Sequence, residues 1–140
     1  MTIVSVTKQI NVPAKKAWDA LSSFRGIENY SPIASSTTSG EGKGATRTCV
    51  MPDGAEINEV LNFVENDNME MQYKITDGPF PISDYISTVK VESIENNSCK
   101  VTWGCEFETS DETKPAMIDL FEGFYNVIID SLENLIKSQN

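Results

Sequence analysis

The chain has 140 residues, contains no histidine, and carries 21 acidic against 11 basic side chains, for a net charge of −10. The lack of histidine excludes imidazole acid–base catalysis, Ser-His-Asp triads and His-ligated metal sites. The acidity and the scattered basic residues argue against binding to nucleic acids or to anionic membranes, which require clustered cations. The length favours one domain over residues 1–140.

The three cysteines, Cys49, Cys99 and Cys105, are too few for a disulfide framework and form no CxxC motif. We interpret them as small, buried, apolar side chains. The N-terminus lacks the basic and apolar regions of a signal peptide, and no long apolar run indicates a membrane span. We therefore expect a cytoplasmic protein with no stable membrane anchoring, no metal and no cofactor.

A β-strand is predicted over residues 2–11, because Val4, Val6 and Ile10 alternate with polar residues, although Lys8 interrupts their face. Pro13 is expected to occupy the first position of a short helix, where its missing N–H costs nothing. A second short helix is expected around residues 25–29, before Ser31-Pro32.

Alternating polar and apolar residues then predict further strands, the first of them weak, over residues 35–39, 46–51, 56–64, 69–76, 84–92 and 99–108. Residues 40–44 read Gly-Glu-Gly-Lys-Gly, but they lead into a strand and not into a helix. A mobile hairpin loop is therefore a better interpretation than a phosphate-binding loop.

The chain ends in a predicted long helix over residues 113–137, with Pro115 in its first turn. Its apolar residues recur at three- and four-residue spacing, at Met117, Leu120, Phe121, Phe124, Ile128, Leu132 and Leu135. This order of elements predicts an α+β fold in which an antiparallel sheet of about seven strands packs on the long helix.

Strand parity places four polar side chains on the apolar faces of their strands. Arg47 shares a face with Cys49 and Met51, Glu59 with Ile57, Leu61 and Phe63, Tyr73 with Met71 and Ile75, and Tyr85 with Val89 and Val91. An unpaired buried charge is costly, so Arg47 and Glu59 should pair or contact internal water. Two interpretations stay open: a ligand cavity with convergent polar groups, or a structural ion pair or bulge.

Several stretches resemble the START-like superfamily, also called SRPBCC, and its polyketide cyclase/dehydrase-like branch. They are Val12-Pro13-Ala14-Lys15-Lys16-Ala17-Trp18, Asn29-Tyr30-Ser31-Pro32, Gly42-Lys43-Gly44-Ala45-Thr46-Arg47, Gly78-Pro79-Phe80-Pro81 between Tyr73 and Tyr85, and Val101-Thr102-Trp103. The resemblance implies the helix-grip fold shared with birch-pollen allergens, in which a curved sheet wraps around the C-terminal helix, with two short helices after the first strand.

The same resemblance implies a hydrophobic cavity, for which we expect Tyr73, Phe80, Val89, Trp103, Phe121 and Phe124 to bind the ligand. One member of the superfamily, lachrymatory factor synthase, rearranges a small sulfenic acid with a cavity arginine, glutamate and tyrosines. Arg47, Glu59, Tyr73 and Tyr85 resemble those residues in order, although the loop between Arg47 and Glu59 is shorter here.

Two main functions follow as hypotheses. The first is a carrier or sensor that binds a small hydrophobic molecule of lipid, polyketide or aromatic type, with loops 40–44 and 78–81 at the rim. The second is a cofactor-free lyase, isomerase or cyclase with Glu59 as general base, Arg47 as oxyanion stabiliser and Tyr85 as acid. An adaptor that acts through the acidic surface is supported only by the net charge.

Overall fold

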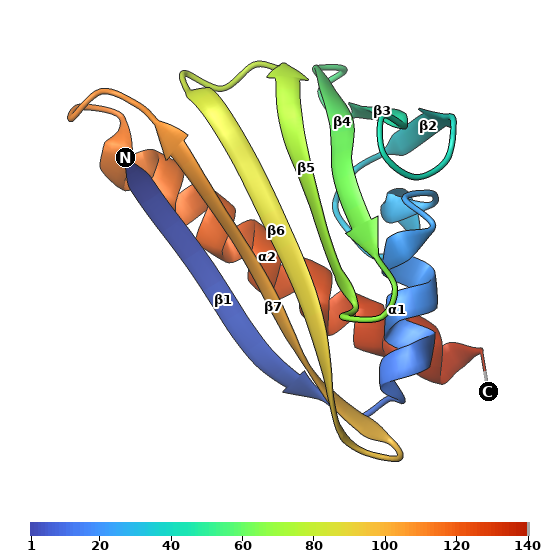
Figure 1. Cartoon of the computed structure of the whole chain (residues 1–140). Helices are drawn as coiled ribbons and strands as arrows, with labels where there is room; N and C mark the ends of the chain where they lie inside the picture. Colours follow the sequence, from blue (N-terminus) through green and yellow to red (C-terminus); the bar gives the residue numbers. More distant parts are fainter. Residues whose placement is uncertain (140) are drawn as a thin grey trace.

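A seven-stranded antiparallel sheet bends around one long helix in the computed structural model, which describes residues 1–139 (Figure 1). In chain order the elements are β1 (Thr2–Ile10), α1 (Ala14–Ser22), the 3-10 turn η1 (Ile27–Asn29), β2 (Ser35–Ser39), β3 (Thr46–Val50), β4 (Glu56–Glu65), β5 (Glu70–Asp77), β6 (Ser83–Glu95), β7 (Ser98–Glu108) and α2 (Lys114–Ser138). This arrangement confirms the predicted α+β class and the helix-grip fold.

The strands are ordered β1-β7-β6-β5-β4-β3-β2, so β1 and β2 form the two edges of the sheet. Strands β2 to β7 pair with their neighbours in sequence, whereas β1 pairs with β7. The segment with α1 and η1 carries the chain from one edge to the other, and α1 contacts α2 (Figure 1). No helix in the described residues is long and apolar enough to cross a lipid bilayer.

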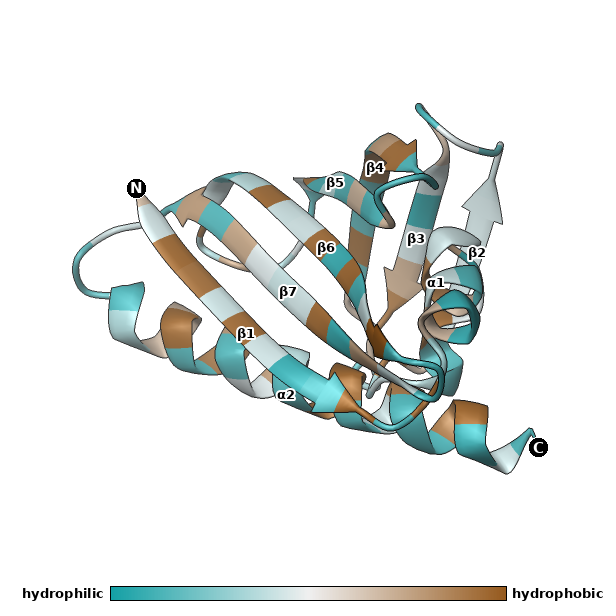
Figure 2. Cartoon of the chain, turned by 60° about the horizontal axis from the view of Figure 1, so that its bottom comes forward, coloured by the Kyte–Doolittle hydropathy of each residue, from teal (hydrophilic) through white to brown (hydrophobic). Residues whose placement is uncertain are grey.

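The core lies between the inner face of the sheet and α2. Along β7 the alternate residues Cys99, Val101, Trp103, Cys105 and Phe107 are buried, and this alternation is visible as changing colour along the strands in Figure 2. Helix α2 contributes Phe121, Tyr125, Ile128, Ile129, Leu132 and Ile136. Fully burying a large apolar side chain contributes about 1.5–3 kcal/mol, so these rows are a main source of stability.

The segment after β1 differs from its prediction. Pro13 caps α1 from the preceding position, with extended backbone, and the helix begins at Ala14. The second predicted helix is only one 3-10 turn, which begins after Gly26 in the left-handed region at φ 72°. A segment this short, with Ile27 as its one buried residue, does not form enough hydrogen bonds to propagate an α-helix. The second short helix expected around residues 25–29 is therefore present, as a single 3-10 turn.

Strand β4 contains a β-bulge that reverses its parity. The pairing of β4 with β5 shifts between Leu61 and Phe63, and beyond the shift Val64 packs against the core. A bulge inserts one extra residue into a strand, and alternation restarts on the opposite face. The prediction that Phe63 shares the inner face with Glu59 and Leu61 was therefore wrong, whereas Glu59, which precedes the bulge, is buried as predicted.

The interruption by Lys8 has a simple cause. Its Nζ lies 2.7 Å from Oδ1 of Asp130 on α2, so the side chain bridges the edge strand and the helix at the rim of the core. Both side chains are partly exposed, and such a pair contributes at most about 1 kcal/mol.

Candidate functional site

A buried ion pair lies on the inner face of β3 and β4. Arg47 and Glu59 are cross-strand partners in the ladder, and Nε of Arg47 donates to Oε1 of Glu59 at 2.6 Å. The side chains are 3% and 8% exposed, so water screens the pair little. Strand alternation therefore places both charges inside, and their direct pairing compensates them.

Aromatic rings cover the guanidinium of Arg47. Its central carbon lies 3.9 Å from the ring centre of Phe24 and 5.1 Å from that of Tyr73. Nη1 donates to the carbonyl oxygen of Phe24 at 3.5 Å, and Nη2 is buried without a partner among the described residues. Burial opposes the positive charge, but the Glu59 carboxylate outweighs it and raises the pKa of Arg47. Arg47 therefore stays cationic.

The two oxygens of Glu59 have different surroundings. Oε1 accepts hydrogen bonds from Nε of Arg47 and from Sγ of Cys49, the latter at 3.6 Å. Oε2 has no donor among the described residues. Burial, reinforced by the carboxylate of Glu59, raises the pKa of Cys49 to about 12, so the thiol stays protonated and donates. The carboxylate thus has one satisfied oxygen and one free to accept a further hydrogen bond.

An interior cavity of about 80 Å³ lies between this pair and α2. Its wall is mainly apolar and combines residues of β3 to β6, η1 and the following loop, the loop before β6, and α2. The lining residues are Ile27, Ile33, Cys49, Met51, Ile57, Glu59, Tyr73, Ile75, Phe80, Tyr85, Leu120, Phe121, Phe124 and Tyr125. Glu59 supplies the one charged group of this wall, and residues far apart in the sequence form it together.

Three buried tyrosines supply phenols to the same wall. The hydroxyls of Tyr85 and Tyr125 are hydrogen-bonded to each other, and Nε1 of Trp103 donates to the hydroxyl of Tyr73 at 3.2 Å. Burial raises the pKa of all three tyrosines above its ordinary value. The phenols therefore remain protonated at neutral pH and can serve as hydrogen-bond donors.

Most of the predicted site residues meet at this cavity: Glu59, Tyr73, Phe80, Tyr85, Phe121 and Phe124 line it. Three others do not belong to its lining. Arg47 contacts the carboxylate of Glu59, Trp103 contacts Tyr73 and stacks on Tyr125, and Val89 is fully buried in β6.

Tyr125 also lines the cavity but was not among the predicted ligand-binding residues, although it follows Phe121 by four positions and so lies on the same face of α2. Loop 40–44 was predicted to lie at the rim of the cavity. In the structure Gly40 and Gly42 border a separate surface hollow beside Phe24 and Arg25, whereas Phe80 of the other predicted rim loop does line the cavity.

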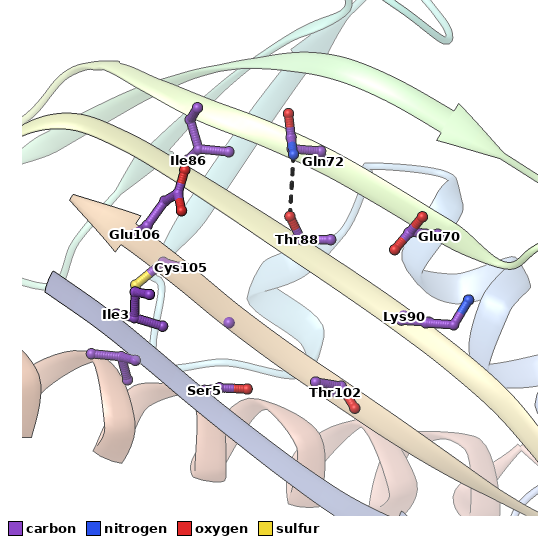
Figure 3. A pocket seen from close by; sticks show the side chains of 12 residues that line it. Ile3, Ser5, Glu70, Gln72, Ile86, Thr88, Lys90, Thr102, Cys105 and Glu106 are labelled. Carbon is purple, nitrogen blue, oxygen red and sulfur yellow. Dashed lines mark hydrogen bonds between the residues drawn. The ribbon is translucent and has the colours of Figure 1, made fainter. Parts of the chain in front are cut away.

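A larger hollow of about 370 Å³ lies on the opposite, outer face of the sheet (Figure 3). It is open and lined by outward-facing residues of four strands, among them Ile3, Gln72, Thr88, Lys90 and Glu106. Nε2 of Gln72 donates to Oγ1 of Thr88 at 3.3 Å there.

No group of three or more metal-ligating side chains occurs among residues 1–139. The interior cavity, with its buried carboxylate, is therefore the candidate site.

The fold is shared with several solved structures. The protein XoxI from Bacillus cereus is 25% identical, with 100% of this chain and 99% of that chain covered and a TM-score of 0.89. A protein from Bacillus thuringiensis is 27% identical, with 95% and 97% covered and a TM-score of 0.83. Norcoclaurine synthase from Thalictrum flavum, solved with dopamine and hydroxybenzaldehyde, has a TM-score of 0.78 over 99% and 88% of the chains. At 14% identity this last likeness concerns the fold alone.

No curated protein matches the sequence of the chain. A protein-family model, in contrast, matches nearly all of it. The model of a protein family described as polyketide cyclase/dehydrase and lipid transport, a part of the SRPBCC superfamily, matches residues 1–137. The match includes every strand and all of α2 except its final residue. The chain therefore belongs to the polyketide cyclase/dehydrase and lipid transport family.

Proposed function

We propose that the protein binds a small hydrophobic molecule in the interior cavity and acts as its carrier or sensor. The observation that carries this proposal is an apolar cavity between the sheet and α2, with one carboxylate and several phenols on its wall. Apolar walls supply affinity at roughly 25 cal/mol per Å² of buried surface, and a few polar groups orient the ligand. Membership of a family that includes lipid transport supports the same function.

The volume of the cavity limits the ligand. About 80 Å³ is roughly half of the 150 Å³ of an engineered cavity that accommodates benzene. A ligand with a ring therefore requires side chains of the wall to move. Leu120 is 41% exposed, and Phe80 and Phe124 are half-buried, so these three have the most freedom to do so. We expect a ligand of about one ring, and not a molecule of sterol size.

A pair of substitutions of equal size on opposite faces of the sheet tests binding. Ile75→Phe adds volume at the cavity wall, and Ile86→Phe adds the same volume at the outer hollow. Native mass spectrometry of the freshly purified proteins, and titration of ¹⁵N-labelled proteins with toluene, measure occupancy. We expect binding by the wild type and by Ile86→Phe, and its loss in Ile75→Phe. Equal binding by both variants, or no binding by the wild type, contradicts the proposal.

Cofactor-free proton-transfer catalysis is a second candidate, favoured by the Glu59 carboxylate on the cavity wall, whose Oε2 accepts no hydrogen bond from residues 1–139. Glu59 would remove a proton from a carbon acid, and the protonated phenol of Tyr85 would donate to the developing oxyanion. Arg47 would stabilise the developing oxyanion from behind the Glu59 carboxylate. Its guanidinium contacts Glu59 and does not line the cavity. The reaction class would be lyase, isomerase or cyclase.

Glu59→Asp tests this second candidate, because it keeps a negative charge for Arg47 but withdraws the carboxylate by one methylene. Exchange of the α-protons of cyclohexanone in D₂O, followed by NMR, measures the proton transfer. A catalytic Glu59 predicts a rate about 10²-fold lower in the variant, with the affinity for toluene unchanged. Exchange by the wild type that is no faster than in buffer, or equal rates for both proteins, rejects catalysis and leaves the binding proposal intact.

A further inference from the structure

We infer that the ligand is a neutral molecule with a hydroxyl group that donates a hydrogen bond to Glu59, and not a carboxylic acid. This inference rests on the proposed binding function and specifies the chemistry of the same site. It follows from how the buried ion pair is oriented with respect to the cavity.

The ion pair presents its negative end to the cavity. Glu59 lines the wall, whereas Arg47 lies behind it and contacts Oε1, Phe24 and Tyr73. A carboxylate oxygen accepts hydrogen bonds and donates none. Because Oε2 accepts no hydrogen bond from residues 1–139 and Glu59 lines the cavity, a donor on the ligand can satisfy it.

An anionic ligand does not fit this arrangement. It would face the carboxylate of Glu59 in a poorly screened interior, where like charges repel strongly. The positive charge that would attract it is already neutralised by Glu59, and the faces of that guanidinium lie against Phe24 and Tyr73. Recognition of a ligand carboxylate by Arg47 is therefore not what the site favours.

A cationic ligand is disfavoured for a different reason. The Arg47–Glu59 pair has no net charge, so an ammonium group would enter without a full counter-ion of its own. It would lose its hydration shell in exchange for one carboxylate oxygen, and the desolvation penalty of an ion is several kcal/mol. A neutral hydroxyl avoids this penalty and still donates one charge-assisted hydrogen bond.

Four probes of similar size separate these chemistries at pH 7: phenol and anisole, which differ in the donor, benzoate, which is an anion, and benzylamine, which is a cation. Titration of the ¹⁵N-labelled full chain, followed at amides of cavity residues such as Ile57 and Ile75, gives the affinities. A hydrogen bond to a charged group predicts about tenfold or more tighter binding of phenol than of anisole. Benzoate and benzylamine should each bind at least tenfold more weakly than phenol.

The control removes the carboxylate without leaving a bare charge. Combining Arg47→Met with Glu59→Leu replaces the pair by apolar groups, a change that proteins commonly tolerate. In this variant the affinities for phenol and anisole should be equal. In a second variant, Glu59→Asp, the carboxylate is withdrawn by one methylene. The difference in affinity between phenol and anisole should therefore be smaller than in the wild type.

Three results would overturn the inference while the binding function stands: equal affinities for phenol and anisole in the wild type, binding of benzoate or benzylamine as tight as that of phenol, or a preference for phenol that persists without Glu59. Failure of all probes, toluene included, would overturn the proposed function together with the inference.

Discussion

Arg47 and Glu59 lie directly opposite each other in the β3–β4 ladder, and their side chains meet on the inner face of the sheet. Because side chains alternate between the two faces, both point inward only in one parity of the pairing. If one of the two strands slipped by one residue, its charged side chain would turn to the outer face. The charged side chain of the other strand would then stay buried without its partner. The same pair therefore stabilises the register of two strands and sets the charge that the cavity presents.

Removing one member of this pair should be far more harmful than removing both. Glu59→Gln leaves the guanidinium of Arg47 buried without a counter-ion, and we expect a loss of about 3–5 kcal/mol in the free energy of unfolding. The double variant Arg47→Met with Glu59→Leu should lie close to the wild type or above it. Urea denaturation measures both. A single variant within about 1 kcal/mol of the wild type would show that the charge finds another partner.

The hydrogen bond between Tyr85 and Tyr125 gives a second prediction. Tyr85→Phe leaves the hydroxyl of Tyr125 without this partner in a buried place, so we expect a loss of about 1–3 kcal/mol. The double variant with Tyr125→Phe should lose less than the sum of the two single losses. A double-mutant cycle by chemical denaturation checks this coupling, and simple additivity would contradict it.

Stability should fall in alkaline solution. Burial raises the pKa of Cys49 from 9.0 to about 12 and that of Tyr30 from 10.0 to about 12. Between these values the folded state keeps protons that the unfolded state releases, so a rise in pH favours unfolding. The stabilising contribution is fully present below pH 9 and is lost as the pH rises toward 12.

Urea denaturation at pH 7, 8, 9.5 and 10.5 measures this effect. We expect the free energy of unfolding to be constant between pH 7 and 8 and to decline above pH 9. Each group steepens this decline by up to about 1.4 kcal/mol per pH unit once it is ionised in the unfolded chain. Tyr30→Phe should make the decline above pH 10 shallower. A free energy of unfolding that stays constant or rises between pH 9.5 and 10.5 is incompatible with these buried groups.

The bulge in β4 predicts that substituting two large apolar residues of this strand causes very different losses of stability. Leu61 is almost fully buried, and Leu61→Ala should cost about 2–5 kcal/mol. Phe63 lies beyond the register shift and is only half-buried, so Phe63→Thr should cost about 1 kcal/mol or less. Thermal or urea unfolding ranks the two variants, and equally large losses for both would show that the strand keeps one parity throughout.

Much of the fold was predictable because burial follows the period of each element. Strand β7 alternates without interruption, and the buried residues of α2 recur at helical spacing. The same rule placed Arg47, Glu59, Tyr73 and Tyr85 inside, and all four are buried. A local pattern is sufficient where a residue's surroundings are decided by the face of its own strand or helix.

Other features depend on contacts between distant segments and could not be derived in this way. The parity change at Phe63 arises from a bulge in the pairing of β4 with β5. The ring of Phe24 covers Arg47 although the two residues are 23 positions apart. The size of the cavity depends on how Phe80, Phe121 and Phe124 pack, and no single segment determines that volume.

Phe121 and Tyr125 belong both to the hydrophobic core and to the wall of the cavity. A molecule that fills the cavity therefore packs against residues that hold α2 on the sheet, and its binding is thermodynamically linked to folding. Linkage adds RT ln(1 + [L]/Kd), or about 2.7 kcal/mol at a ligand concentration one hundred times Kd. A rise in melting temperature would thus report the natural ligand in a compound library without any assay of activity.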